Sequence, residues 1–332
     1  MRLAVVTDAW FPQINGVVRT LDRVREELES QGHEILVISP DAFRSLPCPT
    51  YPEIRLALFP SRKVARLLDA FRPDTIHIAT EAPLGMAAKR YCRRRGLAFT
   101  TSFHTRFPEY VQARFGVPAA WGYAMLRRFH RGSAGVMVAT QSLKQDLAQR
   151  GFENLVDWSR GVDTELFRPR EKDVFDLPRP IFLCVGRVAV EKNLEAFLEL
   201  ELPGSKVVVG DGPLLESLKR RYPGVHFTGA KVGEELARHY ASGDVFVFPS
   251  RTDTFGLVLL EALASGLPVA AYPVTGPLDV VNGAPVGCLD EDLAKAAQSA
   301  LTFGPEACRD HALQYSWRRC AEQFASNLQS LR

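Results

Sequence analysis

The sequence predicts an α/β protein of two doubly wound, parallel-sheet (Rossmann-like) domains. Three observations support this prediction. The chain has 332 residues, which is more than one hydrophobic core usually holds. Short apolar runs alternate with helical patterns, as is typical of a parallel sheet covered by helices on both faces. A charged, proline-rich stretch at residues 160–180 interrupts this alternation once, and the alternation then restarts.

Strands and helices are expected to alternate through the first half. A buried-type strand covers residues 3–8, and the loop after it leads into a helix that ends near Ser30, where Gly32 closes it. The later elements follow the same rhythm. Further strands are expected at 34–39, 75–78, 98–102, 135–139 and 154–158, and helices at 61–71, 84–95, 121–131 and 141–150.

The second half repeats this rhythm. Strands are expected at 181–185, 206–209, 226–228, 244–248 and 269–272, and helices at 190–200, 214–221, 234–241, 256–265, 289–301 and 316–331. We therefore expect a first domain at 1–165, a second at 166–315, and a last helix at 316–332 that packs back on the first domain.

Composition narrows the class of protein. With 46% apolar and 24% charged residues the chain is globular, and it holds no run of about 18 apolar residues that would span a membrane. The opening stretch is too short for a signal peptide. The six cysteines lack metal-ligand spacing, which favours free thiols in a reducing cytosol. We expect a cytoplasmic protein.

The two halves differ in charge. Residues 1–165 hold 23 Lys and Arg against 17 Asp and Glu, a net charge of +6, and the remainder holds 18 against 21, a net charge of −3. Basic residues cluster at 89–95 and 127–131. These clusters are consistent with a solvated helix face or with contact to anionic lipid headgroups. Nucleic acid is not an expected partner, because no recognised binding module accompanies them.

A strand, turn and helix at residues 244–268 suit phosphate binding. The helix that begins near Gly256 leaves its first backbone amides without helical partners, and such an end attracts anions. Asp253 stands on the turn and Glu261 lies within the helix. The amides concerned belong to Phe255, Gly256, Leu257 and Val258.

Two cations follow the first strand of the second half. Arg187, after Gly186, and Lys192 lie at the start of a helix, where positive charge is unfavourable unless an anion such as a diphosphate lies between them. Surface cations are the alternative. The turn with Gly210 and Gly212 follows the next strand and is expected to line the same crevice, although an ordinary turn explains most of it.

The first half offers two weaker candidates. Gly16 stands near a helix start, where the backbone can approach a ligand, and an ordinary turn is the alternative. His104 follows a strand whose carboxyl end faces the crevice in this type of fold, and a structural histidine is the alternative. No Gly-x-Gly-x-x-Gly fingerprint follows the first strand, so a nicotinamide or flavin cofactor has no support.

Taken together, these motifs resemble the retaining GT-B glycosyltransferases of family four, most of all bacterial GDP-mannose-dependent α-mannosyltransferases and related glycolipid transferases. The resemblance to the family's donor-binding half lies in Arg187…Lys192, Gly210-Asp-Gly-Pro and the stretch from Asp253 to Pro268. The resemblance to its acceptor-binding half lies in Thr7-Asp-Ala-Trp-Phe-Pro-Gln-Ile-Asn-Gly-Val and Ser102-Phe-His-Thr-Arg-Phe-Pro. The resemblance implies two Rossmann-like domains facing across a cleft.

The resemblance also implies roles for the matching residues. Arg187 and Lys192 would hold the donor diphosphate, which Gly16 lets the first loop approach. His104 would contact the sugar near its reacting carbon, Glu261 would bind the ribose hydroxyls, and Asp253 would grip the transferred hexose. The family usually has glutamate followed by glycine at the positions of Asp253 and Thr254, so the donor sugar stays open.

The implied reaction transfers a hexose to a lipid or lipid-linked glycan, and mannose from GDP-mannose is the first choice of donor. The basic clusters of the first domain suggest that the acceptor lies at the inner face of a membrane, which this domain would contact. No cofactor and no metal are expected. A UDP-sugar-dependent glycolipid synthase, a nucleotide-sugar epimerase or hydrolase, and a non-catalytic nucleotide-sugar-binding protein are the alternatives.

Overall fold

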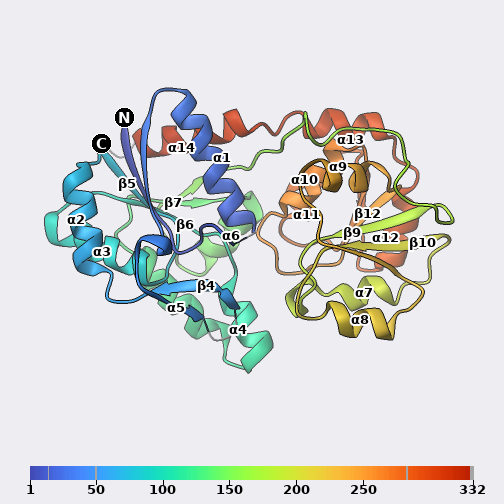
Figure 1. The fold of residues 1–332 in the computed structure, drawn as a ribbon, viewed down its shortest axis with the longest axis horizontal. Coiled ribbons are helices and arrows are strands. Elements are labelled where there is room, and N and C mark those ends of the chain that lie inside the picture. The colour runs from blue at the N-terminus through green and yellow to red at the C-terminus, as the bar shows by residue number, and fades with distance from the viewer. Residues whose placement is uncertain (14, 49–50, 282, 330–332) are drawn as a thin grey trace. The chain divides into compact units, whose positions relative to one another are not determined.

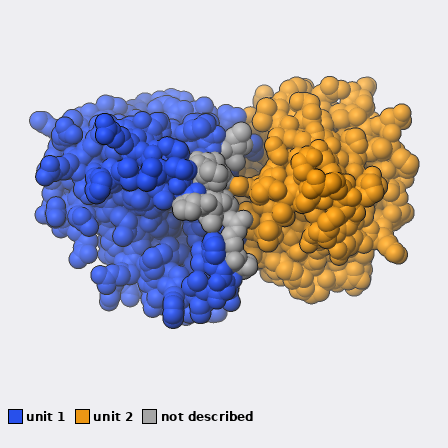
Figure 2. All heavy atoms as spheres, turned by 60° about the horizontal axis from the view of Figure 1, so that its bottom comes forward, with its two compact units in different colours: residues 1–160, 317–332 blue, residues 161–316 orange. Residues whose placement is uncertain are grey.

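The computed structural model describes residues 1–13, 15–48, 51–281 and 283–329. The chain forms two compact units, one of residues 1–160 and 317–332 and one of residues 161–316 (Figure 2). The boundaries expected from the sequence are 165 and 315. The stretch after residue 160 belongs to the second unit, where Phe167 is buried with its ring centroid 5.5 Å from that of Tyr240.

A six-stranded parallel sheet forms the centre of the first unit, with the strand order β2-β1-β5-β6-β7-β8 (Figure 1). Strand β1 pairs with both β2 and β5, so that Leu3 lies opposite Ile35 and Thr75. Parallel neighbours need crossover connections, which the helices supply. The strands are β1 (Arg2–Val6), β2 (Glu34–Ile38), β5 (Thr75–Ile78), β6 (Thr100–Ser102), β7 (Gly135–Val138) and β8 (Leu155–Asp157).

Helices of the first unit follow the expected rhythm. The last helix, α14, lies beside α1 (Figure 1), and the final residues of its expected range, 330–331, lie outside the described residues. The helices are α1 (Gly16–Ser30), α2 (Ser61–Phe71), α3 (Pro83–Arg95), α4 (Phe107–Phe115), α5 (Ala119–His130), α6 (Gln141–Gln149) and α14 (Trp317–Gln329), with a short 3₁₀ helix η1 (Pro40–Ala42).

Two features of the first unit were not predicted from the sequence. An antiparallel hairpin, β3 (Ser45–Cys48) and β4 (Tyr51–Ala57), forms a separate two-stranded sheet, in a segment whose prolines argue against strands. Helix α4 follows the His104 loop directly, with Pro108 in its first turn, where proline is tolerated.

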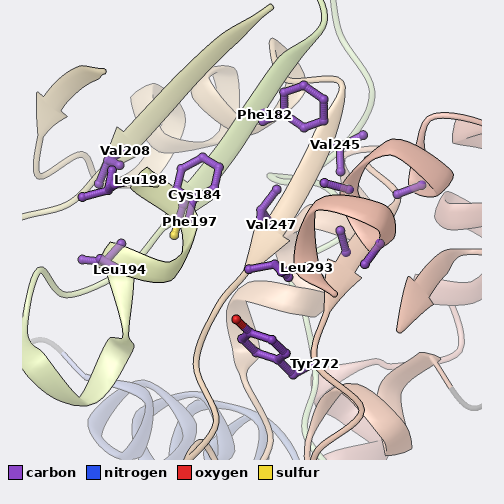
Figure 3. Packing of buried hydrophobic residues seen from close by; sticks show 14 of the residues in the cluster. Phe182, Cys184, Leu194, Phe197, Leu198, Val208, Val245, Val247, Tyr272 and Leu293 are labelled. Carbon is purple, nitrogen blue, oxygen red and sulfur yellow. The ribbon is translucent and has the colours of Figure 1, made fainter. Parts of the chain in front are cut away.

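The second unit also has a six-stranded parallel sheet, in the order β11-β10-β9-β12-β13-β14. Its core packs β9, β10 and β12 against α7, α8 and α12, with Phe182, Val208, Val245 and Phe197 fully or nearly fully buried (Figure 3). The strands are β9 (Ile181–Val185), β10 (Ser205–Val209), β11 (His226–Gly229), β12 (Val245–Phe248), β13 (Val269–Ala271) and β14 (Gly287–Leu289).

Two expected helices of the second unit differ from the structure. The range 190–200 is interrupted, because Asn193 adopts a left-handed conformation (φ 52°) between η2 and α7. In the range 289–301, Leu289 ends a strand and the helix begins only after Asp292, whose side chain accepts hydrogen bonds from the amides of Ala294 and Lys295. The helices are η2 (Val190–Lys192), α7 (Leu194–Leu198), α8 (Leu215–Arg221), α9 (Gly233–Ala241), α10 (Leu257–Ala264), α11 (Pro277–Val281), α12 (Leu293–Ala300) and α13 (Pro305–Ala312).

None of the helices formed by the described residues is both long and apolar enough to cross a membrane. All six cysteines are free thiols.

Candidate active site

The strand order of the second unit defines where a ligand would bind. Strand β9, the first of the unit, lies between β10 and β12, so successive strands run outward in opposite directions from it. In open α/β sheets, ligands bind outside the carboxyl ends of the strands at this point of reversal. The loops after β9 and β12 carry Arg187, Lys192 and Asp253.

Lys192 and Asp253 are in direct contact. The Lys192 ammonium donates to Oδ1 of Asp253 at 2.5 Å, with both side chains largely shielded from solvent. The other carboxylate oxygen, Oδ2, is buried and has no hydrogen-bond partner among the described residues. A buried carboxylate oxygen without a partner is unfavourable, so this atom is suited to accept a hydrogen bond from a ligand.

Hydrogen bonds hold the two loops together around this ion pair. The Asn193 side-chain amide donates to the carbonyl of Pro249 at 3.1 Å, and the Thr252 hydroxyl donates to the carbonyl of Glu191 at 3.3 Å. The left-handed conformation of Asn193 therefore has a structural consequence, because it turns the chain back toward the β12 loop. Lys192 is positioned by both loops.

The three candidate glycines lie where two loops meet. A Cβ at Gly210 would lie 1.8 Å from the carbonyl oxygen of Gly186, and one at Gly212 would lie 2.4 Å from that of Val188. The amide of Val188 donates to the carbonyl of Asp211 at 2.9 Å. Close packing of the loop after β10 on the loop after β9 thus requires glycine at 210 and 212. This packing helps to fix the position of the loop that carries Arg187.

Helix α10 begins at the expected place. Gly256 is its N-terminal flanking residue, with φ of 83°, and no side chain caps this end. A left-handed backbone explains why glycine stands there. Phe255 is buried, whereas Gly256, Leu257 and Val258 are half-buried. The first-turn amides are therefore oriented by a glycine and not occupied by a cap.

Glu261 is buried within the second unit. It is 4% exposed, and its Oε2 accepts a hydrogen bond of 2.8 Å from the hydroxyl of Tyr240, a fully buried residue of α9. A buried carboxylate needs such a donor. Tyr240 was not identified from the sequence, because it stands 21 residues away in α9, whose mixture of apolar and charged residues is that of an ordinary amphipathic helix.

Gly16 is the first residue of α1, and its neighbour has a defined role. The side-chain oxygen of Asn15 accepts from the amides of Val17 and Val18, at 3.0 Å each. Asn15 is thus an N-cap. The amides of Val17 and Val18 are occupied by it, so a diphosphate at this helix end would meet the Gly16 amide or displace the Asn15 side chain.

His104 follows β6 and is surrounded by other basic groups of the first unit. Its Nδ1 lies 3.4 Å from Nη2 of Arg160, and its ring contacts the buried Trp158 edge-on with centroids 5.7 Å apart. Burial, then the charge of Arg160 and the nearby His77 and His130, hold the pKa of His104 well below its usual range. The lowered pKa favours the neutral form of the ring.

Arg160 was not identified from the sequence as a site residue. Its guanidinium is 5% exposed, and among the described residues no carboxylate lies within ion-pair distance of it. Burial lowers its pKa to about 10. The sequence signal was an arginine in the segment just after the last strand of the first sheet, which was assigned only to the linker.

Asp8, at the carboxyl end of β1, was also not identified. Its carboxylate accepts hydrogen bonds from the amide of Leu84 at 3.1 Å, the amide of Gly85 at 3.4 Å and the hydroxyl of Thr80 at 2.9 Å. It therefore ties the start of the Gly16 loop to the first turn of α3. Burial, opposed by these hydrogen bonds, raises its pKa to about 6.

No group of three or more His, Cys, Asp or Glu side chains suited to hold a metal ion occurs among the described residues. Within the second unit the structure brings Lys192 and Asp253 into contact and packs Gly186, Gly210 and Gly212 together. Arg187 lies in the same β9 loop, and Glu261 lies one helix turn beyond the start of α10. Gly16 and His104 belong to the first unit.

Comparisons with known proteins show which family the chain resembles as a whole. Residues 14–166 match the model of Glycosyltransferase Family 4, and residues 179–302 match that of Glycosyl transferases group 1. A GDP-mannose-dependent alpha-mannosyltransferase of Mycobacterium tuberculosis is 33% identical over 87% of this chain and 83% of that protein. An alpha-monoglucosyldiacylglycerol synthase of Streptococcus pneumoniae is 26% identical over 99% of this chain and 84% of that protein.

Among solved structures, sucrose-phosphate synthase of Thermosynechococcus elongatus superposes with a TM-score of 0.79 at 19% identity, over 99% of this chain and 98% of that one. This likeness concerns the fold. The family models cover most of both units, and the mycobacterial relative exceeds 30% identity over most of the chain. The chain therefore belongs to glycosyltransferase family four, as a retaining enzyme with the GT-B fold.

Proposed function

We propose that this chain transfers mannose from GDP-mannose to a hydroxyl group of a lipid or lipid-linked glycan, with retention of the anomeric configuration. The donor is inferred from the mycobacterial relative, whose name specifies GDP-mannose. A UDP-sugar-dependent glycolipid synthase is the second candidate, because the streptococcal relative is named as a glucosyldiacylglycerol synthase.

The contact between Lys192 and Asp253 carries this proposal. It places a cation and a carboxylate side by side at the point of strand reversal, where a diphosphate sugar presents an anionic group next to sugar hydroxyls. The ammonium suits the diphosphate, and the buried Oδ2 of Asp253 suits a hydroxyl of the hexose. A ligand with both groups satisfies both atoms.

The proposed reaction separates charge. The acceptor hydroxyl attacks the anomeric carbon, the bond from this carbon to the diphosphate breaks, and the hydroxyl proton passes to the departing phosphate oxygen. Negative charge develops on the diphosphate, which Arg187 and Lys192 stabilise. This scheme uses no protein nucleophile. It also uses no metal, since the two cations supply the positive charge that Mg²⁺ supplies in other enzymes.

A donor panel tests the proposal. GDP-mannose, UDP-glucose and UDP-galactose are each tested for thermal stabilisation of the chain and for products, with and without a lipid acceptor. We expect GDP-mannose to stabilise most and glycolipid to form. An epimer or free sugar as the only product would support the epimerase or hydrolase alternative, and binding without turnover would support a non-catalytic protein.

The first unit provides a surface suited to an anionic membrane. A groove of about 950 Å³ lies between α3 and α5, with Leu126 and Phe129 as its buried apolar floor. Five exposed arginines surround the groove, and none of them has a carboxylate partner among the described residues. They are Arg90, Arg93, Arg94, Arg128 and Arg131. Burial, then Arg93 and Arg128, lowers the pKa of Lys89, as expected in a positive field.

Exposed apolar side chains continue this surface. Trp121 and Met125, one turn apart on α5, are 73% and 67% exposed, and Phe107, Val111 and Phe115 repeat the same spacing on α4. Apolar side chains beside unpaired cations are typical of membrane-surface helices. We infer that the first unit binds peripherally to the leaflet that carries the acceptor.

Vesicle sedimentation tests this inference. The chain is expected to sediment with phosphatidylglycerol-containing vesicles at low salt and not with pure phosphatidylcholine, and Arg128→Gln with Arg131→Gln should weaken binding severalfold. Arg220→Gln, an exposed arginine of the second unit, is the matched control. Equal binding by the double variant would contradict the assignment of this groove.

A further inference from the structure

We propose that Arg160 is a positioning residue that holds the His104 ring neutral with its proton on Nε2, so that the ring offers an N–H donor from that atom. The inference deepens the proposed function, on which it rests for the role of His104. It concerns contacts within the first unit only.

The hydrogen-bonding capacity of arginine determines the tautomer. A guanidinium has five N–H donors and no acceptor. Nη2 of Arg160 lies 3.4 Å from Nδ1 of His104, so Nδ1 must present its lone pair there and carry no proton. A neutral imidazole has one N–H, which is then on Nε2. The partner of one ring nitrogen thus determines the state of the other.

Three contacts hold Arg160 in place. Its Nη1 donates to the carbonyl of Trp158 at 2.6 Å and to that of Ser159 at 3.0 Å, and its guanidinium stacks on the Trp158 ring at 4.4 Å from the centroid. These contacts leave Nη2 directed at the histidine. They also fix the guanidinium against the Trp158 indole, which itself lies edge-on to both His77 and His104.

Helix α14 holds this segment from behind. Gln323 accepts from the amide of Ser159 at 2.8 Å, Asn327 donates to the carbonyl of Asp157 at 2.8 Å, and the thiol of Cys320 donates to the carbonyl of Ser159 at 3.1 Å. The ring of Phe324 packs on Trp158 at 4.8 Å. The C-terminal helix therefore has a function in the site, since it fixes the arginine that orients His104.

The charges around His104 explain why this arrangement is useful. The titratable groups that face it are Arg160, His77 of β5 and His130 of α5, and Cys320 of α14 faces Arg160. In the proposed reaction positive charge develops at the anomeric carbon. An imidazolium would oppose that charge, whereas a neutral ring with Nε2–H donates to a sugar hydroxyl without doing so.

If Arg160 had only a structural role, its burial would be explained, but the absence of a carboxylate partner among the described residues would not. Buried cations are usually paired with carboxylates, because an unpaired one costs stability. Among the described residues the neighbours of the guanidinium are two carbonyl groups, an indole, the Cys320 thiol and a histidine. A buried cation that contacts the candidate catalytic ring and no carboxylate costs stability, and such costs are typical of functional sites.

Histidine side-chain ¹⁵N NMR on the full chain tests the proposal without turnover. The chain has seven histidines, and His104→Gln assigns the signal of interest. The wild-type ring is expected to carry its proton on Nε2 at pH 8, where a histidine is neutral. A proton on Nδ1 at that pH would overturn the proposal whatever the variants do.

Two variants separate the hydrogen bond from the charge. Arg160→Gln retains an N–H donor without charge, and Arg160→Met removes both. We expect the Gln variant to keep the Nε2 proton but to titrate at higher pH, and the Met variant to populate the Nδ1 tautomer as well. If both variants fold, as the buried His77 signal shows, and both retain the wild-type tautomer and titration, the proposal is wrong.

Measuring the turnover of the Arg160 variants is the second test of the proposal. With Arg160→Met we expect kcat to fall roughly 10- to 100-fold with little change in KM for the donor, and to fall further as pH decreases from 8 to 6, because misorientation affects the chemical step more than binding. Arg66→Met, which removes an exposed arginine of α2 in the same unit, is the control. A wild-type chain without turnover on any donor would refute the proposed function, and the NMR arm would still decide on Arg160.

Discussion

Lys192 and Asp253 form an ion pair of 2.5 Å between the loops that follow β9 and β12, the two strands on either side of the point of strand reversal. The first prediction concerns the cation. Lys192→Ala should lower kcat by about 10²–10³-fold, because it removes charge aimed at the leaving diphosphate. Arg187→Ala should act in the same direction. Donor turnover measured under saturating acceptor checks both.

The control for these variants is Lys219→Ala, which removes an exposed cation of α8 in the same unit. It should leave turnover unchanged, and circular dichroism should show the same fold for all three variants. Near-normal turnover by Lys192→Ala or by Arg187→Ala would refute the assignment of that residue.

The second prediction concerns the acid of the pair. Asp253→Asn removes the charge that competes with a diphosphate for Lys192 and also the carboxylate that suits a sugar hydroxyl. We therefore expect KM for the donor to fall severalfold while kcat falls by about 10²-fold. Asp253→Glu keeps the charge and should recover part of kcat. Steady-state kinetics with GDP-mannose and UDP-glucose measures both effects.

The ratio of the two donors is the sharper readout. If Asp253 contacts the hexose, adding one methylene must change the relative kcat/KM of GDP-mannose and UDP-glucose by about tenfold. A ratio unchanged in Asp253→Glu would show that this carboxylate acts only on Lys192.

The third prediction concerns loop packing. Gly210→Ala should destabilise the second unit by about 1–3 kcal/mol, since its Cβ would meet the Gly186 carbonyl at 1.8 Å and force the loops apart. It should also raise KM for the donor, because Arg187 follows Gly186. Calorimetry is suitable, as the second unit contains no tryptophan. Gly224→Ala, where a Cβ meets nothing within 4 Å, is the control.

Local sequence patterns predicted the helices and strands more accurately than they predicted which residues contact one another. The range 75–78 and the start of α10 agree with the structure, because apolar alternation and a glycine act over a few residues. The helix expected at 190–200 is wrong, because no local signal placed Asn193 in a left-handed conformation. That conformation is supported by a hydrogen bond to Pro249, 56 residues away.

The candidate site shows the same division. Arg187, Lys192, Asp253 and Glu261 were predicted as members of a site, and the contact of Lys192 with Asp253 spans 61 residues that no local pattern connects. Arg160 and Tyr240 were missed for the same reason, since each acts through one long-range hydrogen bond. Residue types can be read locally, whereas their partners depend on the fold.

The last prediction concerns Asp8 and pH. Its pKa is raised to about 6 from an ordinary 3.8, chiefly by burial, so the folded state binds its proton more tightly than the unfolded state does. Its contribution to the free energy of unfolding therefore grows as pH falls from 7 toward 4. Between pH 7 and pH 5 the gain is about 1 kcal/mol. Asp8→Asn should lose this pH dependence.

Urea denaturation at pH 7, 6 and 5, followed by tryptophan fluorescence, measures the effect. All four tryptophans lie in the first unit, as Asp8 does, so the signal reports the unfolding of that unit. Glu153→Gln, an exposed carboxylate of the same unit, should retain the wild-type dependence. A free energy of unfolding that changes equally with pH in Asp8→Asn and in the wild type would show that Asp8 is ionised across this range, with its hydrogen bonds to Leu84, Gly85 and Thr80 outweighing its burial.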